Sequence, residues 1–395
     1  MLLFSLACVV DEPLACGSGT HEKDGLCVAD EGDTATDSAA DADTDSDADT
    51  DADSDADSDT DADSDTDTDT DTDTPYTVCD DGVAPFTDIQ DAVDAAADGD
   101  TISVCAGTYG AVELEDRELT LVGDGADVTT IFGGGSGALS VTGGEVEVSH
   151  FALRGTGDGS AGGAVTASEA DDLYVHDVSI TEAGGSVLIL QMGGNAIWEN
   201  IVMADNTLGE SSSMAIIIGG PGGGSALVRH LSYTNNSAYT ILYVNTIDAV
   251  VENSVFADSS YGMLGVSVQA YGGDHVVQNN VFHGVTPTMG GSTRLFYFDG
   301  ANFRNNIVSE SPASELYWAT GASTSYNDSW GSNGSFSGTD NLGADPKFTD
   351  AAAGDFTLRA GYSPCIDAGD PSSDHDDADG SRNDMGAYGG PAGSW

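Results

Sequence analysis

The sequence predicts an all-β protein built from stacked coils, and two observations support this prediction. The first is a recurring corner of hydrophobic, polar and Asn residues, as in VVENSVFADSS, VVQNNVFHGVT and FRNNIVSES. Aligned on this corner, eight positions follow one another at steps of 22 to 30 residues: His150, Asp177, Asn200, His230, Asn253, Asn279, Asn305 and Asn327. The second observation is 52 glycines in 395 residues. A period of roughly 20–30 residues with glycine-rich turns indicates a solenoid.

The charge of the chain excludes several classes of partner. Nine Lys and Arg residues stand against 68 Asp and Glu residues, which gives a formal net charge of -59. Such a chain repels nucleic acid and anionic membrane surfaces. It also repels acidic polysaccharides unless a divalent cation bridges the two. We therefore expect no nucleic-acid partner, and a polysaccharide or surface glycan remains as the candidate partner.

Residues 1–8, MLLFSLAC, form a signal-like segment that ends in Ser-Leu-Ala-Cys. This ending resembles a bacterial lipobox and implies that Cys8 is lipidated. No Lys or Arg precedes the apolar run, and the run is short for a signal peptide. A cleaved or merely hydrophobic N-terminus is the alternative. No apolar stretch of about 20 residues occurs, so we expect membrane attachment only through a lipid anchor.

Residues 9–32 form a small Cys-containing segment, and residues 33–75 form an acidic linker. From Asp41 to Asp73 every odd position is Asp, alternating with Ala, Ser or Thr. Repulsion between these charges opposes both helix and sheet, so the composition predicts a disordered, extended spacer. The alternative is a calcium-binding repeat, but the glycine-rich nonapeptide of calcium β-rolls is absent.

Residues 76–339 are the predicted coil domain, and a helix is expected at its start. Thr87 can cap this helix with Gln90 as its capping-box partner. Its apolar face is Phe86, Ile89, Val93 and Ala96. This segment resembles the N-terminal cap of right-handed parallel β-helix proteins of the pectin lyase-like superfamily. The resemblance implies three-strand coils, about eight or more of them, with each aligned Asn or His in a tight turn of left-handed (αL) conformation.

The cysteines predict disulfides and an oxidising compartment. Cys16 and Cys27 bracket CGSGTHEKDGLC, and Cys79 and Cys105 bracket the start of the coil domain. Neither CxxC nor a Cys/His ligand spacing occurs, which favours two disulfides over a zinc site. Cys365 is left over, and we expect it to be buried and free.

Residues 340–395 contain DPKF, GDFTLRAGYSPCIDAG and DGSRNDMGAY in that order. Together these motifs resemble choice-of-anchor segments of secreted bacterial proteins. Aspartates surround Gly380, and their carboxylates could hold Ca²⁺, although the spacing is not that of an EF-hand loop. The candidate ligands are Asp374, Asp376, Asp379 and Asp384. The alternative is a turn in which Arg382 pairs with one or two of the aspartates.

The expected working face is the first strand of each coil. Tyr and Trp can stack on sugar rings, while amides bind hydroxyl groups. The candidate ligand-binding residues are Gln191, Tyr243, Asn245, Gln269, Tyr297 and Trp318. For catalysis, Asp299 and Arg294 are weak candidates, because a hydrolase needs converging carboxylates and a lyase needs a base and a cation. His275 and His283 are expected in turns and loops away from them.

Three functions remain open. The leading hypothesis is a glycan-binding or adhesive protein without catalytic activity, located at the cell surface or secreted. Its only candidate cofactor is Ca²⁺. A polysaccharide lyase or glycoside hydrolase follows, and a structural envelope component is third. We expect a monomer.

Overall fold

The structure is a computed structural model that describes residues 20–23, 26–29, 76–155, 164–184, 188–191, 194–208, 214–219, 224–245, 248–269 and 274–395. The chain divides into two compact units, Met1–Asp69 and Thr70–Trp395. In the first unit, β1 (Thr20–Lys23) and β2 (Leu26–Ala29) form an antiparallel pair. No helix in the described ranges is long and apolar enough to cross a membrane.

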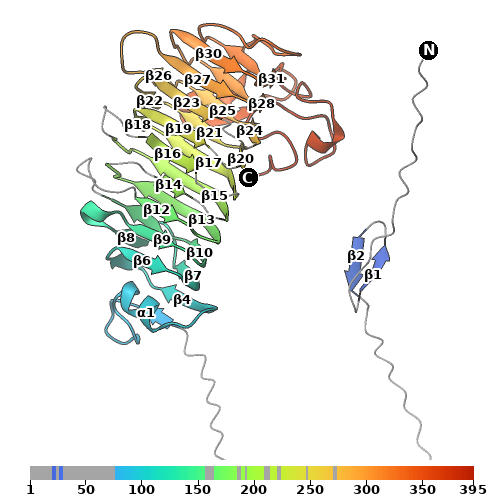
Figure 1. Ribbon diagram of the computed structural model, residues 1–395. Coiled ribbons are helices and arrows are strands. Elements are labelled where there is room, and N and C mark those ends of the chain that lie inside the picture. The colour runs from blue at the N-terminus through green and yellow to red at the C-terminus, as the bar shows by residue number, and fades with distance from the viewer. Residues whose placement is uncertain are drawn as a thin grey trace, which may run out of the picture. The chain divides into compact units, whose positions relative to one another are not determined.

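The second unit is a right-handed parallel β-helix, as the sequence predicts (Figure 1). The first strands of the coils form a nine-stranded parallel sheet, which we call the first-strand face. Its strands are β6 (Val112–Glu115), β9 (Leu139–Thr142), β12 (Val165–Ser168), β14 (Leu188–Gln191), β16 (Met214–Gly219), β19 (Thr240–Asn245), β23 (Leu264–Gln269), β27 (Arg294–Asp299) and β30 (Glu315–Thr320). Parallel strands joined by crossovers wind in the right-handed sense because of their intrinsic twist.

The second and third strands of the coils belong to one 18-stranded sheet that bends between them. The second-strand face consists of β3 (Tyr76–Val78), β4 (Asp100–Val104), β7 (Glu118–Gly123), β10 (Glu145–Ser149), β20 (Asp248–Glu252), β24 (His275–Gln278), β28 (Asn302–Arg304), β31 (Ser323–Ser325) and the first halves of β13 (Asp172–Thr181), β15 (Asn195–Ala204) and β17 (Ser225–Thr234). The third-strand face consists of the second halves of those three strands with β5 (Gly107–Tyr109), β8 (Thr129–Phe132), β11 (Ala152–Arg154), β21 (Val255–Ala257), β25 (Val281–His283), β29 (Ile307–Ser309) and β32 (Asp328–Trp330).

Shorter elements complete the unit. A three-stranded sheet lies between the third and first strands, and a hairpin lies in the C-terminal segment. These strands are β18 (Ser237–Ala238), β22 (Ser260–Tyr261), β26 (Thr286–Pro287), β33 (Phe348–Asp350) and β34 (Asp355–Leu358). The helices are α1 (Ile89–Ala95) and the 3₁₀ turns η1 (Gly134–Ser136), η2 (Ala351–Ala353) and η3 (Ser373–His375).

The interior of the coils is filled by the apolar side chains that alternate along each strand. Val251 and Phe256 face this interior. Phe256 and Phe282 occupy the same position in successive coils, and their rings stack with centroids 4.8 Å apart. Stacked aromatic rings in register contribute to the packing of one coil on the next.

The corner between the second and third strands has the left-handed backbone that the sequence predicts. Positive φ angles of 46° to 65° occur in seven successive coils, at His150, Asp177, Asn200, His230, Asn253, Asn279 and Asn305. Asn and Asp favour this conformation because their side chains bond nearby backbone groups. The prediction is wrong by one residue in the last coil, where Tyr326 has φ 55° and Asn327 points inward.

A second Asn ladder, absent from the sequence prediction, follows directly after these corners. Asn280, Asn306 and Asn327 are fully buried, and the Nδ2 of each donates to the next amide oxygen at 3.0–3.1 Å. Each amide therefore satisfies backbone groups that the corner would otherwise leave unpaired. A second row of positive-φ residues ends the third strands: Asp205, Asn235, Asp258, Gly284, Glu310 and Gly331.

Helix α1 covers the first coil, but its N-cap differs from the prediction. Asp88, not Thr87, is the N-cap, and its Oδ1 accepts from the Gln90 N–H at 2.8 Å. A carboxylate is the stronger acceptor at the positive end of a helix. The Gln90 amide instead bonds the backbone of Glu113 in β6, with Glu113 N–H donating to Oε1 at 2.8 Å. Ile89, Val93 and Ala96 are buried as expected.

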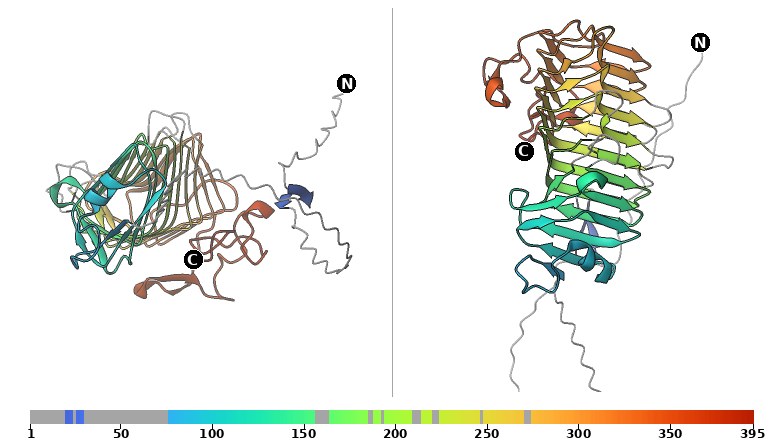
Figure 2. Two further views of the ribbon diagram at one scale, coloured as in Figure 1. Left: turned by 90° about the horizontal axis from the view of Figure 1, so that it is seen from below. Right: turned by 90° about the vertical axis from the view of Figure 1, so that its left-hand side faces the viewer.

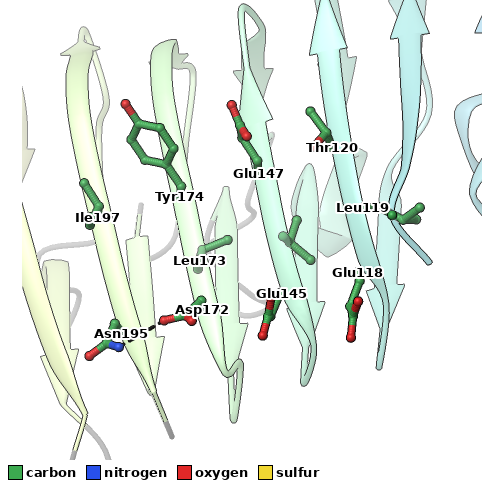
Figure 3. Close-up of a pocket in the computed structure, with 12 residues that line it drawn as sticks. Glu118, Leu119, Thr120, Glu145, Glu147, Asp172, Leu173, Tyr174, Asn195 and Ile197 are labelled. Carbon is green, nitrogen blue, oxygen red and sulfur yellow. Dashed lines mark hydrogen bonds between the residues drawn. The ribbon is translucent and has the colours of Figure 1, made fainter. Parts of the chain in front are cut away.

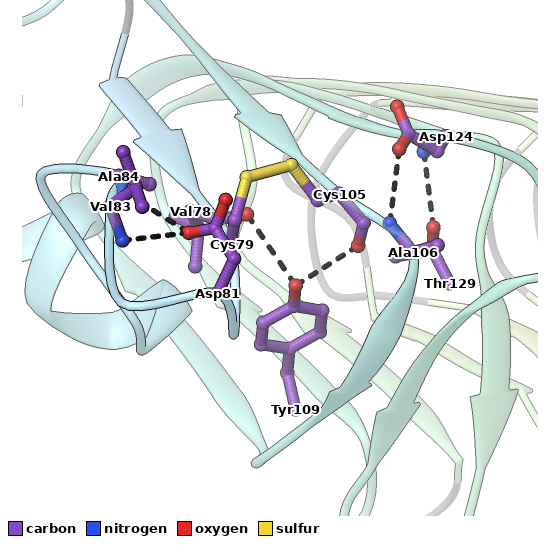
Figure 4. The surroundings of a disulfide bond; sticks show 10 residues. All are labelled: Val78, Cys79, Asp81, Val83, Ala84, Cys105, Ala106, Tyr109, Asp124 and Thr129. Carbon is purple, nitrogen blue, oxygen red and sulfur yellow. Dashed lines mark hydrogen bonds between the residues drawn. A yellow bond between two sulfur atoms is a disulfide. The ribbon is translucent and has the colours of Figure 1, made fainter.

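A disulfide links the first two strands of the domain (Figure 4). Cys79 and Cys105 are bonded, as the sequence predicts, and Cys365 is buried and free. The Tyr109 hydroxyl donates to the carbonyl of Cys105 at 3.0 Å beneath the bond. Cys8 and Cys16 lie outside the described residues, and of Cys27 only the backbone position in β2 is described.

The C-terminal segment runs along the third-strand face and the adjoining corner (Figure 2). Phe356, Cys365 and Met385 pack against Val281 and Ile307 in a second apolar cluster, outside the coils. The segment belongs to the same compact unit as the coils.

The outward-facing corner amides hold this segment in place. Asn253 Nδ2 donates to the carbonyls of Ala387 at 3.0 Å and Gly389 at 2.7 Å. Asn279 Nδ2 donates to the Asp384 carbonyl at 3.0 Å. Asn305 Oδ1 accepts from the N–H of Asp370 at 2.8 Å. His230 Nε2 lies 2.8 Å from the carbonyl of Ala392 and extends the series to a fourth coil.

Candidate functional site

The first-strand face presents two parallel rows of outward side chains. The register aligns Tyr243, Ser267, Tyr297 and Trp318 in one row. Two residues further along each strand, it aligns Asn245, Gln269, Asp299 and Thr320 in the other. Neighbouring members of a row are roughly 4.8 Å apart, the spacing of parallel strands. Gln191 ends β14 on the same sheet, but its side chain lies outside the described residues.

The aromatic row contains a stacked pair. The rings of Tyr297 and Trp318 lie 4.8 Å apart with 15° between their planes. Trp318 is 40% exposed, so part of this aromatic surface faces solvent. Tyr243 accepts a hydrogen bond from Asn245 Nδ2 at 3.2 Å, and Gln269 Nε2 donates to Ser267 at 3.2 Å. These bonds fix the amides beside the aromatic row.

The two weak catalytic candidates do not come together. Arg294 begins β27 and Asp299 ends it, so about five residues, roughly 16 Å of strand, separate them. Arg294 is paired instead with Glu315 on β30, with Nε and Oε2 2.6 Å apart. His275 begins β24 and is buried, and His283 ends β25, so the expectation that both lie in turns or loops is wrong. The first-strand face therefore lacks converging acid and base groups among its described side chains.

A hollow lies elsewhere, on the second-strand face near the N-terminal coils (Figure 3). Its volume is about 400 Å³, and it opens to solvent. Ile197, which is 38% exposed, contributes apolar surface, whereas Leu119, Val146 and Leu173 belong to the buried interior behind it. The other lining residues are Gly99, Glu118, Thr120, Glu145, Glu147, Asp172, Tyr174 and Asn195. None of the sequence-predicted ligand-binding or catalytic residues lies on this face.

A group of titratable side chains borders the hollow, and His176 is at its centre. His176 Nε2 lies 3.1 Å from Glu147 Oε1, and Nδ1 lies 2.7 Å from Asp177 Oδ2. The Tyr174 ring stacks on the imidazole at 4.4 Å. Burial alone would lower the pKa of His176, but the two carboxylates outweigh it and raise this pKa above its ordinary value. His176 is therefore more readily protonated than a free histidine.

Glu199 lies on the next coil and connects this group to Arg229 and His230 on the coil after it. The Tyr174 hydroxyl donates to Glu199 Oε2 at 3.3 Å, and Arg229 Nη2 donates to the same oxygen at 3.0 Å. His230 Nδ1 lies 3.4 Å from Oε1. Burial would raise the pKa of Glu199, but the Arg229 guanidinium holds it below the usual range. Burial together with Glu199 raises the pKa of Tyr174.

One signal in the sequence could have located this group. The segments EVEVSH, DLYVHD and AIWENI alternate apolar and polar residues, which places Glu147, Tyr174, His176 and Glu199 on one outward face. In the repeat pattern these segments stand out by their corners at His150, Asp177 and Asn200. The outward residues just before each corner differ from coil to coil and therefore give no repeating signal.

The aspartates around Gly380 serve the C-terminal segment. Asp377 accepts from the Asp384 N–H at 3.1 Å, and Asp379 accepts from the Ser381 N–H at 2.9 Å. Burial raises the pKa of Asp384 to about 6. Within the described residues, no group of three or more His, Cys, Asp or Glu side chains could hold a metal ion. The expected grouping of Asp374, Asp376, Asp379 and Asp384 around Ca²⁺ is therefore not formed.

The expected alternative, a pairing of Arg382 with these aspartates, is also wrong. Arg382 Nε donates to the carbonyl of Gly369 at 2.8 Å, and Nη2 donates to that of Ala368 at 3.3 Å. The guanidinium carbon lies 6.0 Å from the centre of the Tyr326 ring. Arg382 therefore links two parts of the C-terminal segment and contacts the last coil.

Comparisons with known proteins find similar structures but no sequence relatives. No family model matches the chain, and no curated protein matches it. A pectin methylesterase from Erwinia chrysanthemi has a TM-score of 0.40 and 13% identity over 71% of this chain and 95% of that one. A pectin methylesterase from carrot has a TM-score of 0.41 and 13% identity over 72% and 97%. An alginate lyase from Paenibacillus sp. str. FPU-7 has a TM-score of 0.37 and 16% identity over 65% and 94%. At these values the likeness concerns the course of the chain and not its chemistry.

Proposed function

We propose that this protein is a secreted or surface-attached glycan-binding β-helix that holds a neutral polysaccharide on its first-strand face. The observation that carries the proposal is the Tyr297–Trp318 stack beside an in-register polar row. Aromatic faces pack against the C–H surfaces of sugar rings, while amide groups bond hydroxyls. Repetition of the rows along the coils suits an extended polymer more than a small ligand.

The location outside the cytoplasm is part of the proposal. The Cys79–Cys105 disulfide supports an oxidising compartment. The Asp-rich residues 33–75 would act as a spacer between the coil domain and a lipid on Cys8. Attachment through Cys8 can be checked by mass spectrometry of the full-length protein isolated from membranes.

A glycan array followed by calorimetry tests the binding proposal. Trp318→Ala and Tyr297→Ala should each weaken binding of the best neutral oligosaccharide about tenfold, because each removes one stacked ring. Trp330→Ala is the matched control, since Trp330 is 41% exposed but lies on the third-strand face. Equal losses in Trp318→Ala and Trp330→Ala, or no binding of any neutral glycan, would refute the proposal.

A second candidate function is acid–base catalysis on a polysaccharide at the second-strand hollow. It is favoured by Glu147 and Tyr174, which line an open space of about 400 Å³, and by His176, which contacts both of them. A protonated His176 could act as a general acid, and Arg229 offers a positive charge one coil beyond Glu199. The test is release of reducing ends from a polysaccharide panel. Turnover that His176→Asn and Glu147→Gln abolish would establish catalysis, and its absence across the panel would leave binding alone.

A further inference from the structure

A separate hollow lies where the C-terminal segment meets the last coils of the third-strand face. Its volume is about 300 Å³. It is bounded by β25, β29 and β32 on one side and by the β33–β34 hairpin on the other. The lining residues are His283, Ser309, Glu310, Trp330, Asp345, Pro346, Lys347, Phe348, Ala351 and Arg359. Two motifs that the sequence analysis left without a role, DPKF and GDFTLRAGY, supply half of them.

The hollow brings together two of the nine Lys and Arg residues in this acidic chain. Arg359 and Lys347 are neighbours across the hairpin, with the Arg359 N–H donating to the Lys347 carbonyl at 3.0 Å. Lys347 Nζ is paired with Asp345 Oδ2 at 2.7 Å. Among the Lys and Arg side chains that the structure describes, Arg359 alone has no oxygen partner. Its guanidinium carbon lies 5.2 Å from the centre of the Tyr362 ring.

The wall formed by the coils carries Trp330 and His283, and rings of the hairpin pack against His283. Trp330 ends β32, in register with Ser309, and is 41% exposed. His283 Nδ1 lies 2.8 Å from Ser309 Oγ. The rings of Phe348 and Phe356 contact the imidazole at 6.0 Å and 5.2 Å. The lining of this hollow of about 300 Å³ therefore combines an exposed indole with two cationic side chains.

We propose that this hollow binds a sugar ring that carries an anionic substituent. Trp330 would stack on the ring, Arg359 and Lys347 would bond the anionic group, and Glu310 would accept from hydroxyls. A planar guanidinium without a carboxylate partner suits bidentate bonding of a carboxylate or sulfate. An indole beside it favours a ring over a bare inorganic ion. The site is on another face from the proposed neutral-glycan surface, so either can exist without the other.

Calorimetry with three probes at low and high ionic strength tests this proposal on the full chain. The probes are a hexuronate trimer, the neutral hexose trimer of the same linkage, and inorganic sulfate. We expect the hexuronate trimer to bind at this site through short contacts with Arg359 and Lys347, against the long-range repulsion of a chain with net charge -59. Because salt screens the repulsion as well as the local contacts, the comparison between probes at each ionic strength carries the test. The neutral trimer should bind this site at least about tenfold more weakly, since it loses the charge-assisted bonds.

Variants locate the binding. Arg359→Gln and Trp330→Ala should each weaken the hexuronate trimer about tenfold. Lys347→Asn should also weaken it, and Asn tolerates the φ of 57° at this position. The matched controls Arg294→Gln on β27 and Arg154→Gln on β11, which lie outside the hollow, should leave it unchanged. Equal binding of the neutral trimer, equally tight binding of sulfate, no binding at all, or losses only in the control variants would each overturn the proposal.

Discussion

The inner Asn ladder makes a strong quantitative prediction about stability. Asn306 is fully buried between Asn280 and Asn327. Its Oδ1 accepts from both the backbone N–H and the Nδ2 of Asn280 at 3.0 Å. Its Nδ2 donates to the carbonyls of Val277 at 2.9 Å and Arg304 at 2.8 Å. Asn306→Ala removes all of these bonds while leaving the apolar interior of the coils intact.

The expected loss of stability depends on which hydrogen-bonding groups keep a partner after the Asn306 side chain is removed. Asn280 Nδ2 keeps its bond to the Val251 carbonyl, and the Arg304 carbonyl keeps the bond from the Asn279 N–H. The backbone N–H of Asn280 keeps none. A buried unpaired N–H costs about 2 kcal/mol, and the lost bonds contribute about 1 kcal/mol more. We therefore expect a loss of about 3 kcal/mol in the free energy of unfolding.

Urea unfolding followed by far-ultraviolet circular dichroism measures this loss. Asn302→Ala is the control on the same coil, because Asn302 is exposed on β28 and should change the free energy by no more than about 0.5 kcal/mol. Hydrogen exchange at Asn280 should accelerate in Asn306→Ala only. A loss below about 1 kcal/mol, or the same loss in both variants, would refute the argument that the amide ladder holds the coils together.

Three further predictions concern the ends of the domain. Burial raises the pKa of Asp328 to about 6 from 3.8, so the folded protein binds this proton more tightly and stability falls as pH rises from about 4 to about 6. Asp328→Asn should remove about 3 kcal/mol of that fall, seen as a flatter plot of urea midpoint against pH, and an unchanged plot would contradict it. Reducing the Cys79–Cys105 bond, which spans 26 residues, should cost about 3 kcal/mol, and the double Ser variant should no longer respond to reductant. Asn279→Ala should expose residues 383–390 to hydrogen exchange without unfolding the coils, whereas unchanged protection there would show that this amide does not hold the segment.

The fold could be predicted because each coil repeats a local requirement. A left-handed corner restricts the residue at one position, so Asn253, Asn279 and Asn305 stand out in the sequence. The inward ladder of Asn306 and its equivalents could not be predicted because each member adjoins the corner residue. The sequence alone does not show which of two adjacent asparagines points into the coil and which points outward. The same ambiguity explains the error at Tyr326, where the inward Asn327 was aligned with the outward corners.

The candidate sites were harder to predict because they depend on register between coils. The stack of Tyr297 on Trp318 requires that β27 and β30 pair without a shift, and the positions of Arg294 and Asp299 follow from the same register. The contact of Glu147 with His176 joins residues 29 positions apart. The hollow at Arg359 requires the C-terminal segment to fold back on the third-strand face, which no periodicity in the sequence indicates.

The outward-facing corner asparagines also bind the C-terminal segment, which explains the coils in which they occur. A left-handed corner accepts Gly, Asp, His or Asn, and the earlier coils use His150, Asp177 and Asn200. Three Asn in succession, Asn253, Asn279 and Asn305, occur in coils that the C-terminal segment covers, and each bonds its backbone. Glycine would adopt the same φ but has no side-chain amide to bond the C-terminal segment. The run of asparagines therefore marks both the corner of the solenoid and the path of the segment that closes its side.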